Sequence, residues 1–144
     1  MSIKKLQLKI VTPERTLLEE EVDQVTIPTT EGEITILPDH IPLVASLKSG
    51  DVVAVSNGEA IPMAVTGGFI EVKDNTVAIL ADYAEHVSEI TEDAIEKAKA
   101  QAADLQKKQQ NGEVVDFEHF EAELERSLNR VKVADKWKSK KYRK

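Results

Sequence analysis

Residues 4–11 read Lys-Lys-Leu-Gln-Leu-Lys-Ile-Val, and they set the pattern for the first part of the chain. Leu6, Leu8 and Ile10 alternate there with polar residues. Because side chains on a β-strand point alternately to opposite faces, this alternation predicts a strand with one buried face. The chain therefore begins with β structure.

Further short segments rich in Val, Ile and Thr follow, with turn-forming Gly, Asn and Asp residues between them. They lie at residues 22–27, 33–37, 43–47, 51–55, 61–65, 68–72 and 76–80. Eight short strands at this spacing predict an antiparallel β-sandwich or flattened barrel rather than an alternating α/β fold. Proline cannot donate in a sheet, so we expect Pro28, Pro38, Pro42 and Pro62 at strand ends, edges or loops.

After Asp82 the composition changes to Ala, Glu, Lys and Gln, which favour helices. Thr91 is a plausible N-cap for a first helix, and Asn111-Gly112 supplies its stop. The apolar residues of that helix keep helical spacing: Ile95, Ala98, Ala102 and Leu105.

A second helix is expected to begin at Asp116 as its cap. Its apolar residues recur every three or four positions: Phe117, Phe120, Leu124, Leu128 and Val131. The short link predicts an antiparallel αα-hairpin. Each Ala in place of Leu on the apolar stripe of the first helix contributes about 2 kcal/mol less burial free energy. We therefore expect the two helices to be held weakly.

The fold class is therefore α+β, with an N-terminal antiparallel β-sandwich over residues 1–86 and a C-terminal two-helix hairpin over residues 87–144. The net charge of −7 argues against nucleic acid and anionic lipid as partners of the body of the chain. The last 13 residues differ, with seven cations and one carboxylate. Such an end is either a solvated tail or a contact for an acidic partner.

The sequence lacks the usual signatures of catalysis and of membrane insertion. Its longest purely apolar run, residues 77–81, cannot span a bilayer, and the first residues do not resemble a secretory signal, so we expect a cytosolic protein. Cysteine is absent, Gly67-Gly68 stands without a phosphate-binding Lys-Ser/Thr, and His40, His86 and His119 show no ligand spacing. We therefore expect a protein that is not an enzyme and binds no cofactor or metal.

The run at residues 31–44, Glu-Gly-Glu-Ile-Thr-Ile-Leu-Pro-Asp-His-Ile-Pro-Leu-Val, closely resembles the hallmark loop of the epsilon subunit of the F-type ATP synthase. Residues 10–15, 66–72 and 75–82 also resemble that family, in the family's order. The resemblance covers the whole chain, because the family has a β-sandwich followed by two helices.

Membership of this family implies a rotor subunit on the central stalk of a proton- or sodium-driven ATP synthase. Such a subunit couples the gamma subunit to the c-ring and lies peripherally at the cytoplasmic face of the inner or plasma membrane, which it meets only indirectly. In the family the loop that includes Glu33, Asp39 and His40 faces the c-ring. Pro38 and Pro42 would brace that loop and limit the ordering entropy of a contact. The alternative is that these side chains are merely solvated.

The resemblance also implies that the helical hairpin is regulatory. It would fold against the sandwich or extend along gamma toward the alpha/beta catalytic head, where it restrains ATP hydrolysis. An acidic segment of the beta subunits would meet the basic end of the chain. That end comprises Arg126, Arg130, Lys132, Lys136, Lys138, Lys140, Lys141, Arg143 and Lys144.

One departure from the family concerns ATP. Several bacterial relatives bind ATP on the folded hairpin through an Ile/Leu-Asp-x-x-Arg-Ala stretch, where this chain has Ile90-Thr91-Glu92-Asp93-Ala94-Ile95. Thr91 replaces the Asp and Ala94 replaces the Arg, which removes the cation best placed to meet a phosphate. We therefore expect weak or absent ATP binding.

An alternative function is a β-sandwich adaptor whose basic helical tail recruits an acidic protein or RNA. A stable complex with a gamma subunit would distinguish the rotor subunit from such an adaptor.

Overall fold

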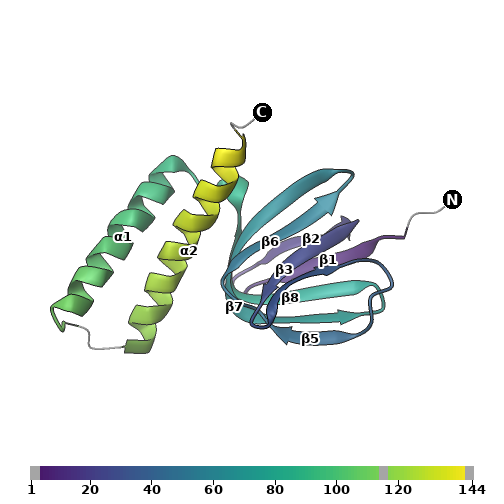
Figure 1. The fold of residues 1–144 in the computed structure, drawn as a ribbon, viewed down its shortest axis with the longest axis horizontal. Coiled ribbons are helices and arrows are strands. Elements are labelled where there is room, and N and C mark those ends of the chain that lie inside the picture. The colour runs from purple at the N-terminus through teal and green to yellow at the C-terminus, as the bar shows by residue number, and fades with distance from the viewer. Residues whose placement is uncertain (1–3, 114–116, 142–144) are drawn as a thin grey trace. The chain divides into compact units, whose positions relative to one another are not determined.

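The computed structural model describes residues 4–113 and 117–141, and its chain divides into two compact units. The first comprises residues 1–86 and the second residues 87–144. The first unit is built of strands and the second of helices (Figure 1).

Eight strands make up the first unit in the part of the chain that is described. They are β1 (Leu6–Val11), β2 (Thr16–Val22), β3 (Gln24–Thr29), β4 (Gly32–Ile36), β5 (Leu43–Ser46), β6 (Gly50–Ser56), β7 (Glu59–Lys73) and β8 (Thr76–His86). They pair in the order β2-β1-β8-β7-β6-β3-β4, and β5 pairs with β7. Most pairs are antiparallel, as predicted, but β1 and β8 run parallel, which departs from the predicted antiparallel sandwich.

The core of the sandwich lies between its faces and is formed by alternate residues of the strands. Leu6, Leu8 and Ile10 of β1 are fully buried, which confirms the alternation predicted for this segment. They pack in one cluster with Val, Ile, Leu and Met side chains from β2, β3, β4, β6, β7 and β8. Burial of this apolar area is the main stabilising contribution to the sandwich.

Strand β7 links the two faces of the sandwich. Along one edge, residues 59–65 pair with β6 and residues 69–72 pair with β5, while β8 follows the other edge from Met63 to Lys73. The sequence predicts separate strands at 61–65 and 68–72, with residues 66 and 67 between them. The strand instead continues through Gly67 and Gly68, which both have positive φ. Glycine tolerates this conformation without breaking the pairing.

Strand β2 was not predicted. Its sequence, Thr-Leu-Leu-Glu-Glu-Glu-Val, lacks the alternation of a half-buried strand and has a run of glutamates that disfavours β structure. It lies at the end of the strand order, where charged residues protect an edge from pairing with another chain. Pro62 fits the expectation for proline, because the pairing of β7 with β8 begins only at Met63.

The second unit contains a 3₁₀ turn, η1 (Val87–Glu89), and two helices, α1 (Glu92–Gln110) and α2 (Phe117–Lys141), which form an antiparallel hairpin (Figure 1). Thr91 caps α1 as predicted: its Oγ1 accepts a hydrogen bond of 3.1 Å from the backbone N–H of Ala94. At the other end Gly112 has a φ of 69°, the left-handed conformation expected after a helix. The predicted cap Asp116 lies outside the described residues.

The seam of the hairpin is narrow. Helix α1 buries Ile95, Ala98, Ala102 and Leu105, all as predicted. On α2, Phe120 is buried and Leu124 and Val131 are half-buried, whereas Leu128 was wrongly predicted to pack, because 45% of its surface is exposed. Each residue turns a helix by about 100°, which carries Leu128 some 80° away from Phe120 and puts the small residues Ser127 and Ala134 closer to the stripe. Ser127 and Ala134 are both buried. The side chain of Phe117 is not described.

Candidate functional site

Glu33 stands at the start of β4, just after the turn between β3 and β4. The Thr29 hydroxyl donates a hydrogen bond of 2.5 Å to the carbonyl of Gly32 and accepts one of 3.2 Å from the N–H of Glu31. Gly32 has a φ of 118°, which closes the turn. Glu33 itself is exposed and lies opposite Pro28 in the ladder. The turn therefore presents a carboxylate to solvent on a well-ordered support.

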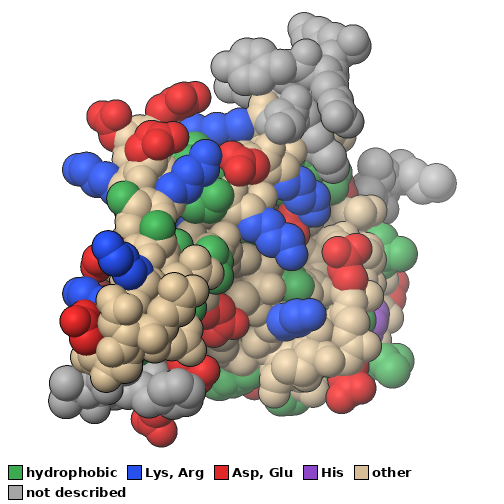
Figure 2. All heavy atoms as spheres, turned by 60° about the vertical axis from the view of Figure 1, so that its left-hand side comes forward, with side chains coloured by type: hydrophobic (Ala, Val, Ile, Leu, Met, Phe, Trp, Pro, Cys, Tyr) green, Lys and Arg blue, Asp and Glu red, His purple; other side chains and the backbone are tan. Residues whose placement is uncertain are grey.

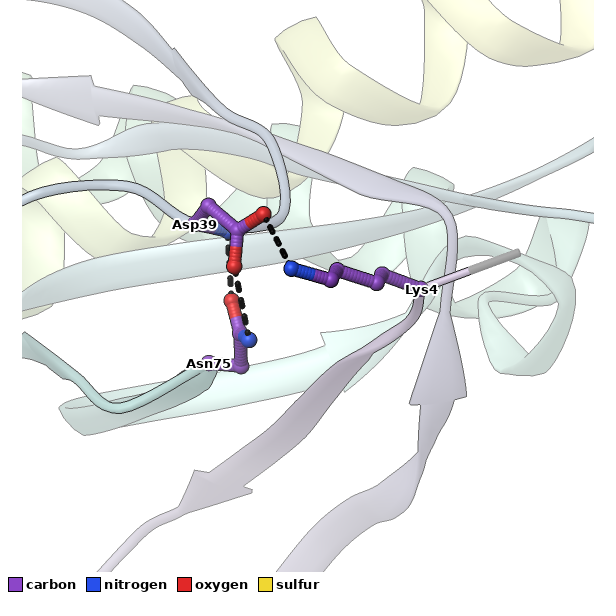
Figure 3. Close-up of polar contacts among 3 residues, drawn as sticks. All are labelled: Lys4, Asp39 and Asn75. Carbon is purple, nitrogen blue, oxygen red and sulfur yellow. Dashed lines mark hydrogen bonds and ion pairs between the residues drawn. The ribbon is translucent and has the colours of Figure 1, made fainter. Parts of the chain in front are cut away.

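Asp39 ties three segments of the sandwich together. Its Oδ2 lies 2.8 Å from Nζ of Lys4, just before β1, and its N–H donates a hydrogen bond of 2.5 Å to Oδ1 of Asn75, in the turn between β7 and β8 (Figure 3). Asn75 Nδ2 returns a hydrogen bond of 3.3 Å to Asp39 Oδ1. The Lys4 ammonium, and next the Asn75 amide, lower the pKa of Asp39.

His40 is half-buried next to Asp39. Its Nδ1 lies 2.7 Å from the carbonyl oxygen of Ile41. Since a carbonyl can only accept, Nδ1 carries the proton and donates. The contact orients the ring within the loop.

These three residues do not form one cluster. Glu33 lies at the beginning of β4 and Asp39 lies beyond its end at Ile36, with about 10 Å of strand between Glu33 and Ile36. The end with Glu33 lies near β5, because the N–H of Thr30 donates to Ser46. The end with Asp39 is bound to the β7–β8 turn instead. The structure thus places the predicted residues at two separate points along one edge strand.

Exposed apolar side chains gather in the segment from Leu37 to Val44, and none of them was a predicted site residue. Ile41 is 75% exposed, Val44 70% and Leu37 53%. A shallow groove of about 430 Å³ runs beside β5, lined by Thr29, Thr30, Glu31, Ile34, Leu43, Val44, Ala45, Ser46 and Phe69. In the sequence, the only sign of this surface is a run of apolar residues around Pro38 and Pro42. Exposed apolar side chains that gather in one place mark contact surfaces.

Metal ligation and membrane-spanning length can both be checked over the described residues. No group of three or more of their His, Asp and Glu side chains is placed to hold a metal ion. Neither helix, over the described residues, is long and apolar enough to cross a membrane.

The predicted basic end spreads around α2. Arg126 and Arg130, four residues apart, share one side of the helix, whereas Lys132 and Lys136 share another. Figure 2 shows cations and carboxylates interspersed over the side of the hairpin that faces the viewer. Lys138 lies on a third side of α2, four residues after the buried Ala134 and on the same side as that residue. The side chains of Lys140 and Lys141, and all of Arg143 and Lys144, lie outside the described part.

Comparison with known proteins decides the family. Residues 5–87 match the family model for the ATP synthase delta/epsilon chain, β-sandwich domain. An ATP synthase epsilon chain from Herpetosiphon aurantiacus is 45% identical over 129 residues, which cover 90% of this chain and 93% of that one. The chain belongs to the ATP synthase epsilon family. An epsilon chain from Desulforamulus reducens is 39% identical and covers 90% of this chain and 96% of its own length.

Solved structures agree with this membership. A chain of the Euglena gracilis mitochondrial ATP synthase superposes with a TM-score of 0.62 at 25% identity, covering 90% of this chain and 81% of that one. A chain in the central stalk and c-ring structure from Tetrahymena thermophila shares the fold, with a TM-score of 0.58 at 19% identity. As a member of the epsilon family, the chain is a non-catalytic subunit, peripheral to a membrane complex.

Proposed function

We propose that this chain is the epsilon subunit of the central stalk, which couples the gamma subunit to the c-ring and restrains ATP hydrolysis. The observation that carries the proposal is the 45% identity to an epsilon chain over 90% of the sequence, since it extends over both the sandwich and the hairpin. The subunit would act at the cytoplasmic face of the membrane that holds the c-ring.

Contact with the c-ring would involve residues at the start of β4 and in the loop after its end. Glu33 offers an exposed carboxylate on a braced turn, and Leu37 and Ile41 offer apolar area beside His40. Asp39 would serve mainly to hold the loop, because Lys4 and Asn75 already bind its carboxylate. A loop that is ordered before binding loses less conformational entropy when the partner arrives.

Regulation of ATP hydrolysis would depend on the helical hairpin. Its seam relies on small side chains, notably Ala98, Ala102, Ser127 and Ala134, so separating the two helices sacrifices little apolar burial. Cations on α2 would then meet the acidic segment of the catalytic beta subunits. Exposed ion pairs contribute only about 0 to 1 kcal/mol each, so this restraint depends on several of them and weakens with salt.

The test compares ATP hydrolysis by the assembled complex with full-length chain and with a chain that ends at residue 86. We expect the truncated chain to assemble with gamma and the c-ring and to hydrolyse ATP faster. Equal rates would contradict the restraint. Failure of the full-length chain to copurify with gamma would contradict the rotor role and favour the adaptor with a basic tail.

A further inference from the structure

Lys138, near the end of α2, makes a contact with a distant part of the chain. Its Nζ donates a hydrogen bond to the backbone carbonyl of Ile90, 48 residues earlier in the chain. Ile90 lies between η1 and the cap of α1, and only 1% of it is exposed. The contact therefore joins the last turns of α2 to the segment that leads into α1.

The Ile90 carbonyl lies outside the hydrogen-bond ladder of α1. That ladder begins with the carbonyl of Thr91, which accepts a hydrogen bond of 3.0 Å from the N–H of Ile95. A buried carbonyl that is not paired is costly. Lys138 supplies a charged donor, and hydrogen bonds of this kind are stronger than those between neutral groups.

Charges near this position act on the Lys138 ammonium in opposite directions. A cation at the N-terminus of a helix is repelled by the helix dipole, which disfavours Lys138 beside α1. Three nearby carboxylates in the sequence, Glu89, Glu92 and Asp93, offset that repulsion, and residues 89–93 contain no cation. These carboxylates therefore favour the Lys138 ammonium at the start of α1.

The position of Lys138 links this bond to helix packing. Lys138 follows Ala134 by one helical turn, on the stripe that is buried against α1. Since the helices are antiparallel, this end of α2 lies beside the start of α1. If α2 moves away from α1, Lys138 must leave the Ile90 carbonyl.

We propose that Lys138 is the latch of the closed hairpin, and that it opposes extension of α2. The proposal rests on the proposed function for its regulatory meaning. It separates the cations of α2 into two classes with opposite effects. Lys132 and Lys136 would strengthen the restraint in the extended form, whereas Lys138 would favour the closed form and so weaken the restraint.

The test uses the full-length chain, which has no native cysteine. A single cysteine in place of the buried Ala102 reports opening through its rate of reaction with a thiol reagent. A hydrogen bond from a charged group contributes enough that Lys138→Met should raise the labelling rate by about tenfold or more. Lys136→Met is the matched control and should leave the rate unchanged, because two residues turn the helix by about 200° and place Lys136 nearly opposite Lys138.

Two further measurements make the result decisive. Lys138→Arg keeps a charged donor and should restore slow labelling, and far-UV circular dichroism should show that each variant stays helical. Equal labelling rates for Lys138→Met and Lys136→Met would overturn the latch. In the assembled complex, Lys138→Met should slow hydrolysis. The labelling assay uses the isolated chain and no ATP synthase. It therefore tests the Lys138 latch independently of the proposed restraint on ATP hydrolysis.

Discussion

Lys4 and Asp39 form an ion pair of 2.8 Å between residues 35 positions apart in the sequence. The pair fastens the loop after β4 to the chain just before β1, and Asn75 adds the turn between β7 and β8 (Figure 3). Asp39 has a φ of 67°, so its backbone takes a conformation that few non-glycine residues adopt. The pair thus helps to hold a loop of unusual backbone geometry in place.

Lys5, the residue after Lys4, takes part in a similar ion pair that holds another turn. Lys5 forms an ion pair with Asp23, and the other carboxylate oxygen of Asp23 accepts a hydrogen bond of 2.8 Å from the N–H of Asn57. Asn57 has a φ of 53° in the turn between β6 and β7. Lys5, and next Asn57, lower the pKa of Asp23. Two consecutive lysines therefore fasten two turns through two aspartates.

The first prediction concerns pH. The folded-state pKa of Asp39 and of Asp23 is lowered, so their contribution to the free energy of unfolding is present above the unfolded-state pKa near 3.8 and is lost as pH falls below it. Asp39→Asn should therefore reduce stability at neutral pH and flatten its decline in acid, while asparagine still tolerates the positive φ. Chemical denaturation at a series of pH values measures this. In a Lys4→Met background the substitution should have a much smaller effect, and an equal effect there would show that the ion pair is not the cause.

The second prediction concerns Gly68 in β7. A Cβ at this position would lie 2.0 Å from the backbone oxygen of Leu80, and the φ of 114° is strained for any other residue. Gly68→Ala should therefore cost about 3 kcal/mol of stability, from the strain and the clash together. Gly58→Ala is the matched control, because its φ is also positive but its Cβ would meet nothing within 4 Å. Urea unfolding should show the larger loss for Gly68, and equal losses would refute the role of the Leu80 contact.

The third prediction concerns the exposed apolar loop. Ile41 is 75% exposed, so Ile41→Ser should leave the unfolding free energy of the isolated chain nearly unchanged. If the loop contacts the rotor, the same change should weaken binding to gamma and the c-ring, because the apolar area buried in the complex falls. Quantitative copurification measures this, with Glu59→Ser at the exposed start of β7 as the control. Normal assembly of the Ile41 variant would remove this residue from the proposed contact.

Much of the fold could be predicted from the sequence, because burial leaves a periodic trace. Alternation in β1 and three-to-four spacing in α1 each indicate which face is packed, and Thr91 and Gly112 mark the ends of α1. Strand β2 leaves no such trace, because an edge strand is stabilised by pairing, and its Glu19 and Glu21 are exposed while Glu20 is half-buried. Leu128 was misassigned because a spacing of four residues drifts around a helix.

The candidate site was less accessible to sequence reasoning. The loop at residues 31–44 was recognised through its resemblance to a family, but no local pattern indicates that Lys4 binds Asp39, because the contact depends on how distant strands pair. The latch between Lys138 and Ile90 spans 48 residues and uses a backbone carbonyl, which has no sequence signature. In the sequence Lys138 looked like one more cation of a basic tail.

The fourth prediction concerns ATP. In this chain the Thr91 hydroxyl is engaged in capping α1, and Ala94 offers no cation for a phosphate. Isothermal titration calorimetry with the full-length chain should therefore detect weak binding or none. Thr91→Asp combined with Ala94→Arg keeps a capping side chain and adds a cation, so the double variant should bind ATP more tightly. Thr91→Asp alone is the control, and tight binding by the unsubstituted chain would contradict the prediction.

The last prediction concerns the exposed cations of α2. Lys132 and Lys136 share one side of the helix, away from the Lys138 contact. If they meet an acidic surface in the extended form, Lys132→Gln combined with Lys136→Gln should raise ATP hydrolysis by the assembled complex about two- to fivefold, given the modest free energy of exposed pairs. Deletion of residues 132–144 should also raise hydrolysis. Because salt screens exposed charges, the difference should shrink as ionic strength rises. Hydrolysis that is unchanged at low salt, or a gain that persists at high salt, would mean that charge on this side of α2 is not the source of the restraint.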